Sequence, residues 1–187
     1  MMKRHFLLFA CLHPLVTFVA VSQPNILIVY HSQTGHTKAM AEAVARGARP
    51  ANVTLKVVAN ATTADVLGAD AVIIGSPVYN ANVAPQLQEF INQWPFEGQP
   101  LKDKIGAAFV TAGGISAGEE LAQLSILHSM LMFGMVVVGG PEWTSAFGAS
   151  AIVGEPPFDP KNVDQAFLRK GEALGKRVAE IAARLKR

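Results

Sequence analysis

The sequence predicts an α/β fold, a doubly wound five-stranded parallel sheet with helices on both faces. Three observations support this prediction. Apolar, strand-like runs alternate with helical patterns after residue 22, and strands separated by helices pair in parallel. The run Ala71–Gly75 has no polar alternation, as expected of a central strand that is buried on both faces. Asn162–Leu185 closes the chain with the apolar spacing of a long amphipathic helix.

The predicted elements follow one another along the chain. Strands are expected at Ile26–His31, Val53–Ala59, Ala71–Gly75, Ile105–Val110 and Met135–Val138. Helices are expected at Thr37–Ala48, Thr62–Leu67, Pro85–Gln93, Glu119–Phe133 and Asn162–Leu185. The remaining stretches are predicted to be loops: Ser76–Val83, the glycine-rich Thr111–Gly118 and the long irregular Pro141–Pro160.

Composition limits the class of protein. The chain has 187 residues, of which 50% are hydrophobic and 16% charged, so it can bury a substantial core and is not expected to be disordered. Lys3 and Arg4 are the only charged residues of the first 22, and the remainder has 14 basic and 14 acidic residues. This balance argues against a nucleic-acid-binding protein. Cys11 is the only cysteine, so we expect no disulfide partner.

Residues 1–22 have the pattern of a signal peptide or N-terminal anchor. Lys3 and Arg4 precede the apolar stretch Phe6–Val21, and Ala20-Val21-Ser22 is a small-x-small cleavage site. The folded domain is therefore expected to span residues 23–187 and to be periplasmic or otherwise exported. The alternative is a cytoplasmic protein whose start codon has been misassigned.

The stretch Ser32-Gln33-Thr34-Gly35-His36-Thr37 is predicted to bind a phosphate. It joins a strand to a helix N-terminus, where free N–H groups and the helix dipole attract anions, and Ser32, Thr34 and Thr37 add hydroxyl groups. With a single glycine, it matches neither the P-loop nor the three-glycine dinucleotide pattern. The alternative is an ordinary turn with a hydroxyl cap.

Two further loops are expected at the same edge of the sheet. Pro77-Val78-Tyr79-Asn80 places an aromatic ring where it can lie against a flat ligand, although a packed tyrosine is the alternative. Thr111-Ala112-Gly113-Gly114 begins a glycine-rich loop whose backbone can approach a ligand closely, although a flexible turn is the alternative.

With these loops, the chain resembles the flavodoxin-like family that includes WrbA-type NAD(P)H:quinone oxidoreductases and FMN reductases. The resemblance covers roughly residues 25–186 and implies strand order 2-1-3-4-5, with FMN at the carboxyl ends of the strands. Asn80-Ala81 and Phe133 depart from the pattern, which often has aromatic-Gly and histidine there, and the chain lacks the family's insertion after strand two. The resemblance implies these FMN-binding residues: Ser32, Gln33, Thr34, Gly35, His36, Thr37, Pro77, Val78, Tyr79, Asn80, Thr111, Ala112, Gly113 and Gly114.

The implied function is an FMN-dependent NAD(P)H dehydrogenase (quinone) that uses NADH or NADPH and a quinone, with no protein residue assigned as catalytic and a possible dimer or tetramer. The alternatives are a one-electron carrier and a non-catalytic FMN-binding module. Gly114-Ile115-Ser116-Ala117-Gly118 also matches a serine-hydrolase motif, but no histidine follows His128 to complete a triad in hydrolase order. No metal site is predicted, because His31 and His36 have no third ligand nearby.

Overall fold

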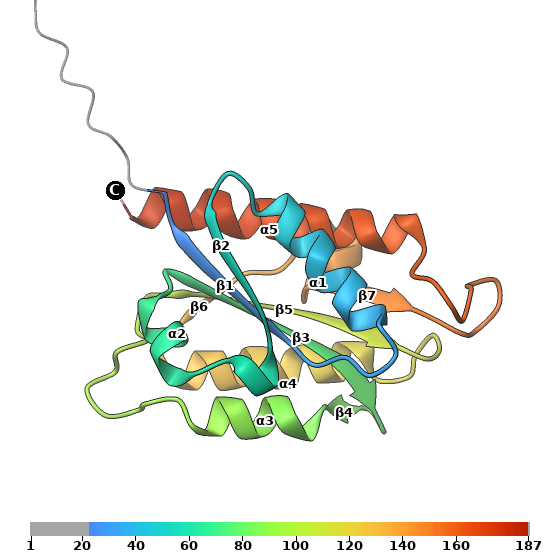
Figure 1. Cartoon of the computed structure of the whole chain (residues 1–187), viewed down its shortest axis with the longest axis horizontal. Helices are drawn as coiled ribbons and strands as arrows, with labels where there is room; N and C mark the ends of the chain where they lie inside the picture. Colours follow the sequence, from blue (N-terminus) through green and yellow to red (C-terminus); the bar gives the residue numbers. More distant parts are fainter. Residues whose placement is uncertain (1–22, 187) are drawn as a thin grey trace, which may run out of the picture.

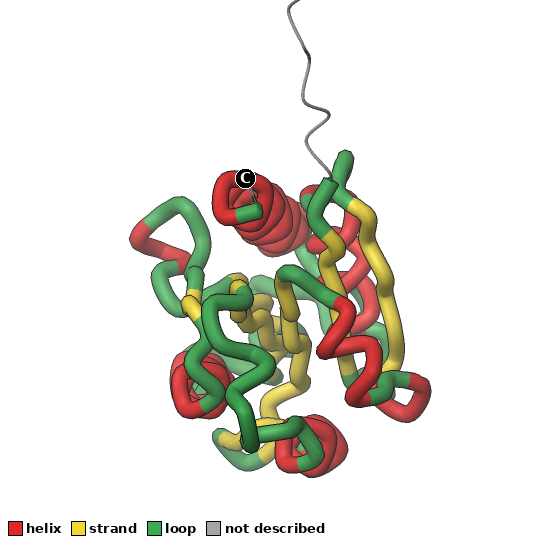
Figure 2. The backbone as a smooth tube through the Cα atoms, turned by 90° about the vertical axis from the view of Figure 1, so that its left-hand side faces the viewer, coloured by secondary structure: helices red, strands yellow, loops and turns green. Residues whose placement is uncertain are grey.

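The computed structural model describes residues 23–186, which form one twisted sheet between two layers of helices (Figures 1 and 2). The path of the sheet is β2-β1-β3-β5-β6, and β4 and β7 pair with β3 and β5. The strands are β1 (Asn25–Tyr30), β2 (Asn52–Val57), β3 (Ala71–Tyr79), β4 (Asn82–Val83), β5 (Ile105–Ala112), β6 (Val136–Val137) and β7 (Ala149–Ile152). The α-helices are α1 (His36–Gly47), α2 (Thr63–Gly68), α3 (Pro85–Asn92), α4 (Glu119–Met132) and α5 (Gln165–Leu185).

The two faces of the sheet have separate apolar cores. Side chains of α1 and α5 pack on one face, and those of α2, α3 and α4 pack on the other. All eight residues of β5 are buried, because this strand lies between β3 and the last strand position. The predicted fold class and the order of its five strand positions are therefore confirmed, whereas the sheet has seven strands where five were expected.

Two glycines allow α1 and α5 to pack closely. A Cβ atom at Gly47 would lie 1.9 Å from the Glu172 carbonyl oxygen, and one at Gly175 would lie 2.0 Å from the Val44 carbonyl oxygen. Only glycine permits this backbone contact, which brings α5 down onto the first helix. The last turn of α1 is thereby held against α5.

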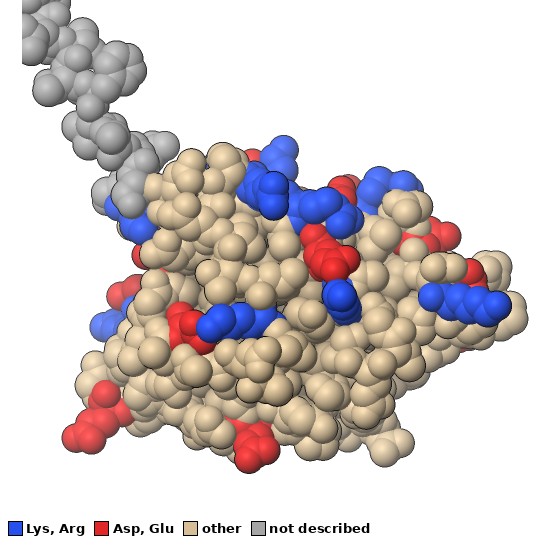
Figure 3. Space-filling model, in the orientation of Figure 1, with Lys and Arg blue, Asp and Glu red and all other residues tan. Residues whose placement is uncertain are grey.

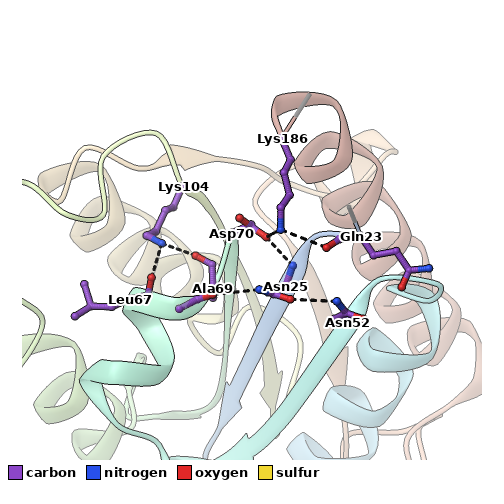
Figure 4. Close-up of polar contacts among 9 residues, drawn as sticks. Gln23, Asn25, Asn52, Leu67, Ala69, Asp70, Lys104 and Lys186 are labelled. Atoms are coloured by element: carbon purple, nitrogen blue, oxygen red, sulfur yellow. Dashed lines mark hydrogen bonds and ion pairs between the residues drawn. The ribbon is translucent and has the colours of Figure 1, made fainter. Parts of the chain in front are cut away.

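A polar network closes the edge of the sheet opposite the predicted site (Figure 4). Lys186 Nζ lies 2.7 Å from Asp70 Oδ2, which also accepts the backbone N–H of Asn25 at 2.7 Å. Burial raises the pKa of Asp70, but these hydrogen bonds and the lysine charge outweigh it, so the pKa is lowered overall. Lys104 Nζ donates to the carbonyl oxygens of Leu67 and Ala69 at the end of α2. The network joins both ends of the described chain to the sheet.

Three sequence predictions about local structure are wrong. β3 continues to Tyr79 and turns back into β4, so Ser76–Val83 forms a hairpin where a loop was expected. Thr111 and Ala112 belong to β5 and not to the following loop. Pro141–Pro160 is not wholly irregular, because it contains a short 3₁₀ helix (Trp143–Ser145) and β7.

The fifth position of the sheet is shared by two short strands. β6 pairs with the beginning of β5 at Ile105 and Gly106, and β7 pairs with its end from Phe109 to Ala112. The predicted strand Met135–Val138 is therefore only the first half of this position. The second half brings the segment that follows β7 beside the predicted site.

The predicted leader, residues 1–22, lies outside the described residues. Among the helices of residues 23–186, none has both the length and the apolar character needed to cross a bilayer.

Candidate functional site

The loop between β1 and α1 offers a cluster of unused hydrogen-bond donors. The backbone N–H groups of Gln33, Thr34, His36 and Thr37 find no acceptor among residues 23–186. Gly35 starts the helix in the left-handed region, at φ 95°, with no side-chain cap, and α1 has no acidic residue in its first turn. Free amides at an uncapped helix N-terminus attract an anion such as a phosphate group.

Two side chains shape this loop from within. Ser32 Oγ accepts the N–H groups of Gly35 and Lys38 at 3.2 and 3.3 Å. Thr34 Oγ1 lies 2.9 Å from His36 Nδ1. The hydroxyls of Ser32 and Thr34 therefore stand beside the free amides, where a phosphate oxygen would accept from them.

The second loop is a tight hairpin. Asn80 and Ala81 both have positive φ, 50° and 62°, as in the two-residue turns that match the twist of paired strands. Ser76 Oγ donates to the Pro77 carbonyl oxygen at 2.6 Å and accepts the Ala84 N–H at 2.9 Å, which fixes the hairpin to the sheet. Tyr79, the last residue of β3, stands at the edge of the site and is half-buried.

The third loop leaves β5 with two glycines. A Cβ atom at Gly113 would meet nothing within 4 Å, so this backbone faces open space. The two amides that follow the glycines already have acceptors. Ile115 N–H donates to the Glu155 carboxylate, and Ser116 N–H donates to Glu119 Oε1 at 3.1 Å. The open donors of the loop are therefore at its glycine end.

Direct contacts join the three loops in pairs. Thr37 Oγ1, in the first turn of α1 just after the first loop, lies 2.8 Å from Thr111 Oγ1, in β5 just before the third loop, and both side chains are buried. A Cβ atom at Gly118 would lie 2.4 Å from the Ala81 Cβ, so the hairpin rests on the end of the third loop.

The first and second loops meet at His31. Its backbone N–H donates to the Gly75 carbonyl oxygen at 3.1 Å, and its ring meets the Tyr79 ring edge-on, with centroids 6.3 Å apart. The three loops thus form one continuous rim around the carboxyl ends of β1, β3 and β5.

The predicted site residues fall into two groups in the structure. The residues that line the accessible part of the rim are Ser32, Gln33, Thr34, Gly35, His36, Tyr79, Asn80, Gly113 and Gly114. Thr37, Thr111 and Ala112 are buried, and the two threonines bond to each other. Pro77 and Val78 are half-buried and belong to the paired part of β3. The residues of the second group therefore support the rim from the protein interior and do not line its accessible part.

Two residues of the site are absent from the set predicted from the sequence. The sequence analysis names His31 only as the end of the first predicted strand and as a histidine with too few partners for a metal site, whereas its ring contacts Tyr79 and lines a cleft of about 450 Å³ beside α3. Glu155 lies in the segment predicted to be irregular, and only the pairing of β7 with β5 brings it to the third loop. No pattern in the sequence points to Glu155.

The structure gives no support to the hydrolase alternative. Ser116 has a positive φ of 59° in the exposed third loop, and no hydrogen bond joins it to a histidine within residues 23–186. In the same residues, no three of the side chains His, Cys, Asp and Glu gather closely enough to ligate a metal ion.

The fold is that of a flavodoxin-like protein, with the three loops side by side at the carboxyl edge of its sheet. The model of the NADPH-dependent FMN reductase family matches residues 56–150. A flavodoxin of Aquifex aeolicus is 37% identical, over 85% of this chain and 87% of the relative. An NAD(P)H dehydrogenase (quinone) of Azorhizobium caulinodans is 33% identical, over 84% of this chain and 98% of the relative.

Structural comparison agrees with these sequence matches. The crystal structure of a WrbA-like flavodoxin from Agrobacterium tumefaciens superposes with a TM-score of 0.72 at 25% identity, over 88% of this chain and 99% of that one. The chain belongs to the flavodoxin-like, WrbA-type branch of the NADPH-dependent FMN reductase family.

Proposed function

We propose that the protein is an FMN-dependent NAD(P)H:quinone oxidoreductase. The observation that carries the proposal is the rim of three joined loops, with free amides at one end and an aromatic ring and open glycine backbone at the other. The matching NADPH-dependent FMN reductase family and the relative named NAD(P)H dehydrogenase (quinone) agree with this chemistry.

The residues present fit FMN. The free amides of Gln33, Thr34, His36 and Thr37 and the Ser32 hydroxyl would hold its phosphate, which is the group that distinguishes FMN from riboflavin. Tyr79 and the backbone of Gly113 would face its ring system. When bound, FMN supplies the capacity to accept a hydride from a nicotinamide and to pass two electrons to an acceptor.

The protein's own part is to position the flavin and to donate hydrogen bonds to its ring. The buried Thr37–Thr111 pair keeps the phosphate end and the ring end of the rim at a fixed separation. Open main-chain N–H groups at Gly113 and Gly114 would donate to polar atoms at the edge of the ring, an electrostatic stabilisation of the kind found in oxyanion holes. No side chain of the rim is required as a nucleophile.

Anaerobic stopped-flow mixing tests the proposal directly. When protein loaded with FMN is mixed with NADH or NADPH, the absorbance of the oxidised flavin should fall within the time of one catalytic turnover. Added quinone should restore that absorbance. Protein that binds no FMN, or bound FMN that neither nucleotide bleaches, would contradict the proposed reductase.

A one-electron carrier is the second candidate, because the relative from Aquifex aeolicus, at 37% identity, is a flavodoxin. Carriers use a surface charge of one sign to steer toward their partners. Here basic and acidic side chains are interspersed over the face drawn in Figure 3, which favours the reductase. In the stopped-flow experiment, a carrier keeps its oxidised spectrum in the presence of both nucleotides.

We also propose that the protein forms a homo-oligomer. The outer surface of α4 exposes apolar side chains, with Leu121 63%, Leu131 52% and Met132 71% exposed, where a solvent-facing helix surface is normally polar. Sedimentation analysis should give a mass that is a multiple of the single chain. A mass equal to one chain at micromolar concentration would contradict this proposal.

The proposed location is the periplasm or another exported compartment. The support is the pattern of residues 1–22, a basic start, an apolar stretch and a small-x-small site before Gln23. N-terminal sequencing of protein from fractionated cells should find Gln23 as the first residue in the exported fraction. Protein that starts at Met1 and stays in the cytoplasmic fraction would favour a misassigned start codon.

A further inference from the structure

The third loop of the site is fastened by a carboxylate from outside the three loops. Glu155 follows β7, and its Oε2 atom accepts the backbone N–H of Ile115. A Cβ atom at Gly114 would lie 2.7 Å from the same oxygen, so the carboxylate stands directly against the Gly114–Ile115 peptide. Its side chain is half-buried.

The backbone fixes Glu155 in this place. Val153 N–H donates to the Ala112 carbonyl oxygen at 2.9 Å, which extends the pairing of β7 with β5 up to the start of the third loop. Phe158 N–H then donates to the Glu155 carbonyl oxygen at 2.9 Å and closes a turn. The carboxylate is therefore held by strand pairing on one side and by a hydrogen-bonded turn on the other.

Two other acidic residues, Glu119 and Asp159, lie on the segments that adjoin Glu155. Glu119 at the start of α4 accepts the neighbouring amide, that of Ser116. Asp159 lies further along the segment that carries Glu155. Hydrogen bonds from Lys161 and Asn162 lower the pKa of Asp159, and the charge of the nearby His36 makes a smaller contribution in the same direction. No salt bridge pairs Glu155 with a lysine or arginine within residues 23–186.

We propose that Glu155 is a positioning residue that sets the reduction potential of the FMN held by the three loops. The inference rests on the proposed function, which brings the flavin ring to the glycine end of the third loop. A hydride adds two electrons and one proton, so the reduced flavin carries one more negative charge than the oxidised form unless it takes up a second proton. An unpaired carboxylate beside the loop opposes that charge, because like charges repel most strongly where water is partly excluded.

Glu155 also has a second effect, which can be separated from the first. By accepting the Ile115 N–H, it holds the loop so that the open amides at Gly113 and Gly114 keep a fixed direction. Glutamine retains an acceptor oxygen and removes the charge, whereas alanine removes both. E155Q therefore tests the charge, and E155A tests the charge together with the hydrogen bond.

The experiment uses the full-length protein and its E155Q, E155A and E97Q variants. Glu97 is an exposed residue between α3 and β5, at the opposite edge of the sheet, so E97Q removes an equal charge far from the site. The dissociation constant of oxidised FMN is measured by fluorescence titration, and the midpoint potential of bound FMN by anaerobic spectroelectrochemistry.

For E155Q, the affinity for reduced FMN relative to oxidised FMN should rise about tenfold, a shift of about +30 mV for a two-electron couple. Its affinity for oxidised FMN should stay within about threefold of wild type, because the loop is still held. E155A should show the same shift in potential and, in addition, bind oxidised FMN about tenfold more weakly. E97Q should match wild type in both measurements.

An unchanged potential in E155Q, with FMN bound normally, would overturn the inference and leave the proposed function intact. A shift of equal size in E97Q would also overturn it, because the effect would then be one of net charge only. Wild-type protein that binds no FMN would overturn the proposed function and the inference with it. Circular dichroism of the FMN-free variants establishes that each is folded, and E155Q keeps the test decisive where E155A is unfolded.

Discussion

The buried hydroxyl pair Thr37–Thr111 gives the sharpest prediction about how the site is assembled. The two side chains are 2% and 5% exposed, and their Oγ1 atoms lie 2.8 Å apart between α1 and β5. T111V keeps the shape of the side chain but leaves the Thr37 hydroxyl buried without its partner. An unsatisfied buried hydroxyl costs about 1–3 kcal/mol. At about 2–4 °C per kcal/mol for a domain of this size, a loss of about 2 kcal/mol lowers the Tm by roughly 4–8 °C.

The double variant T37V/T111V separates a lost hydrogen bond from a general loss of packing. Replacing both partners of a hydrogen bond by apolar groups of the same shape is nearly neutral, so the double variant should regain most of the stability that T111V loses. Urea unfolding followed by circular dichroism measures this on FMN-free protein, because bound ligand would itself raise the stability. Free-energy losses of T37V and T111V that simply add in the double variant would show that the two hydroxyls do not stabilise each other.

Three other substitutions have expected effects on stability or binding. A81G should raise the free energy of unfolding by about 0.5–1 kcal/mol, because Ala81 sits at φ 62°, and thermal unfolding that shows a loss would contradict this. The lowered pKa of Asp70 means that its contribution to stability is present above pH about 4 and is lost as the pH falls through the folded-state pKa. The stability advantage of wild type over D70N at pH 7 should therefore shrink below pH about 4 in urea titrations, and a constant difference would exclude Asp70 as the cause. S32A removes the acceptor for two loop amides and a donor to phosphate, and should weaken FMN binding about tenfold in a fluorescence titration, whereas unchanged affinity would place the phosphate elsewhere.

The architecture could be predicted because its pattern is local. Buried strands such as Ala71–Gly75 and the amphipathic helix near the end of the chain are visible in short windows of sequence. The hydroxyl-rich turn after the first strand could also be recognised, because the groups expected to bind a phosphate are neighbours in the sequence at a helix N-terminus. These features are set by periodicity and by local backbone chemistry.

The missed features depend on tertiary pairing. β7 has four residues, Ala149–Ile152, with an alternation too short to distinguish from a loop until β5 is seen beside it. The hairpin turn holds Ala81 at a positive φ that favours glycine, so Asn80-Ala81 lacks the glycine by which such a turn is usually identified in a sequence. Glu155 acquires a role only through the position of β7. The part of the site that sequence could not define was therefore its ring end, where contacts come from segments far apart in the chain.

The proposed function depends above all on selection of a flavin by its phosphate at the loop Ser32–Thr37. Parallel titrations of the FMN-free protein with FMN and with riboflavin examine this selection, because the two ligands differ only in the phosphate group. We expect saturable binding of one FMN per chain and binding of riboflavin at least about a hundredfold weaker, a difference of about 2.7 kcal/mol. Equal affinity for the two flavins, or no binding of FMN, would contradict it.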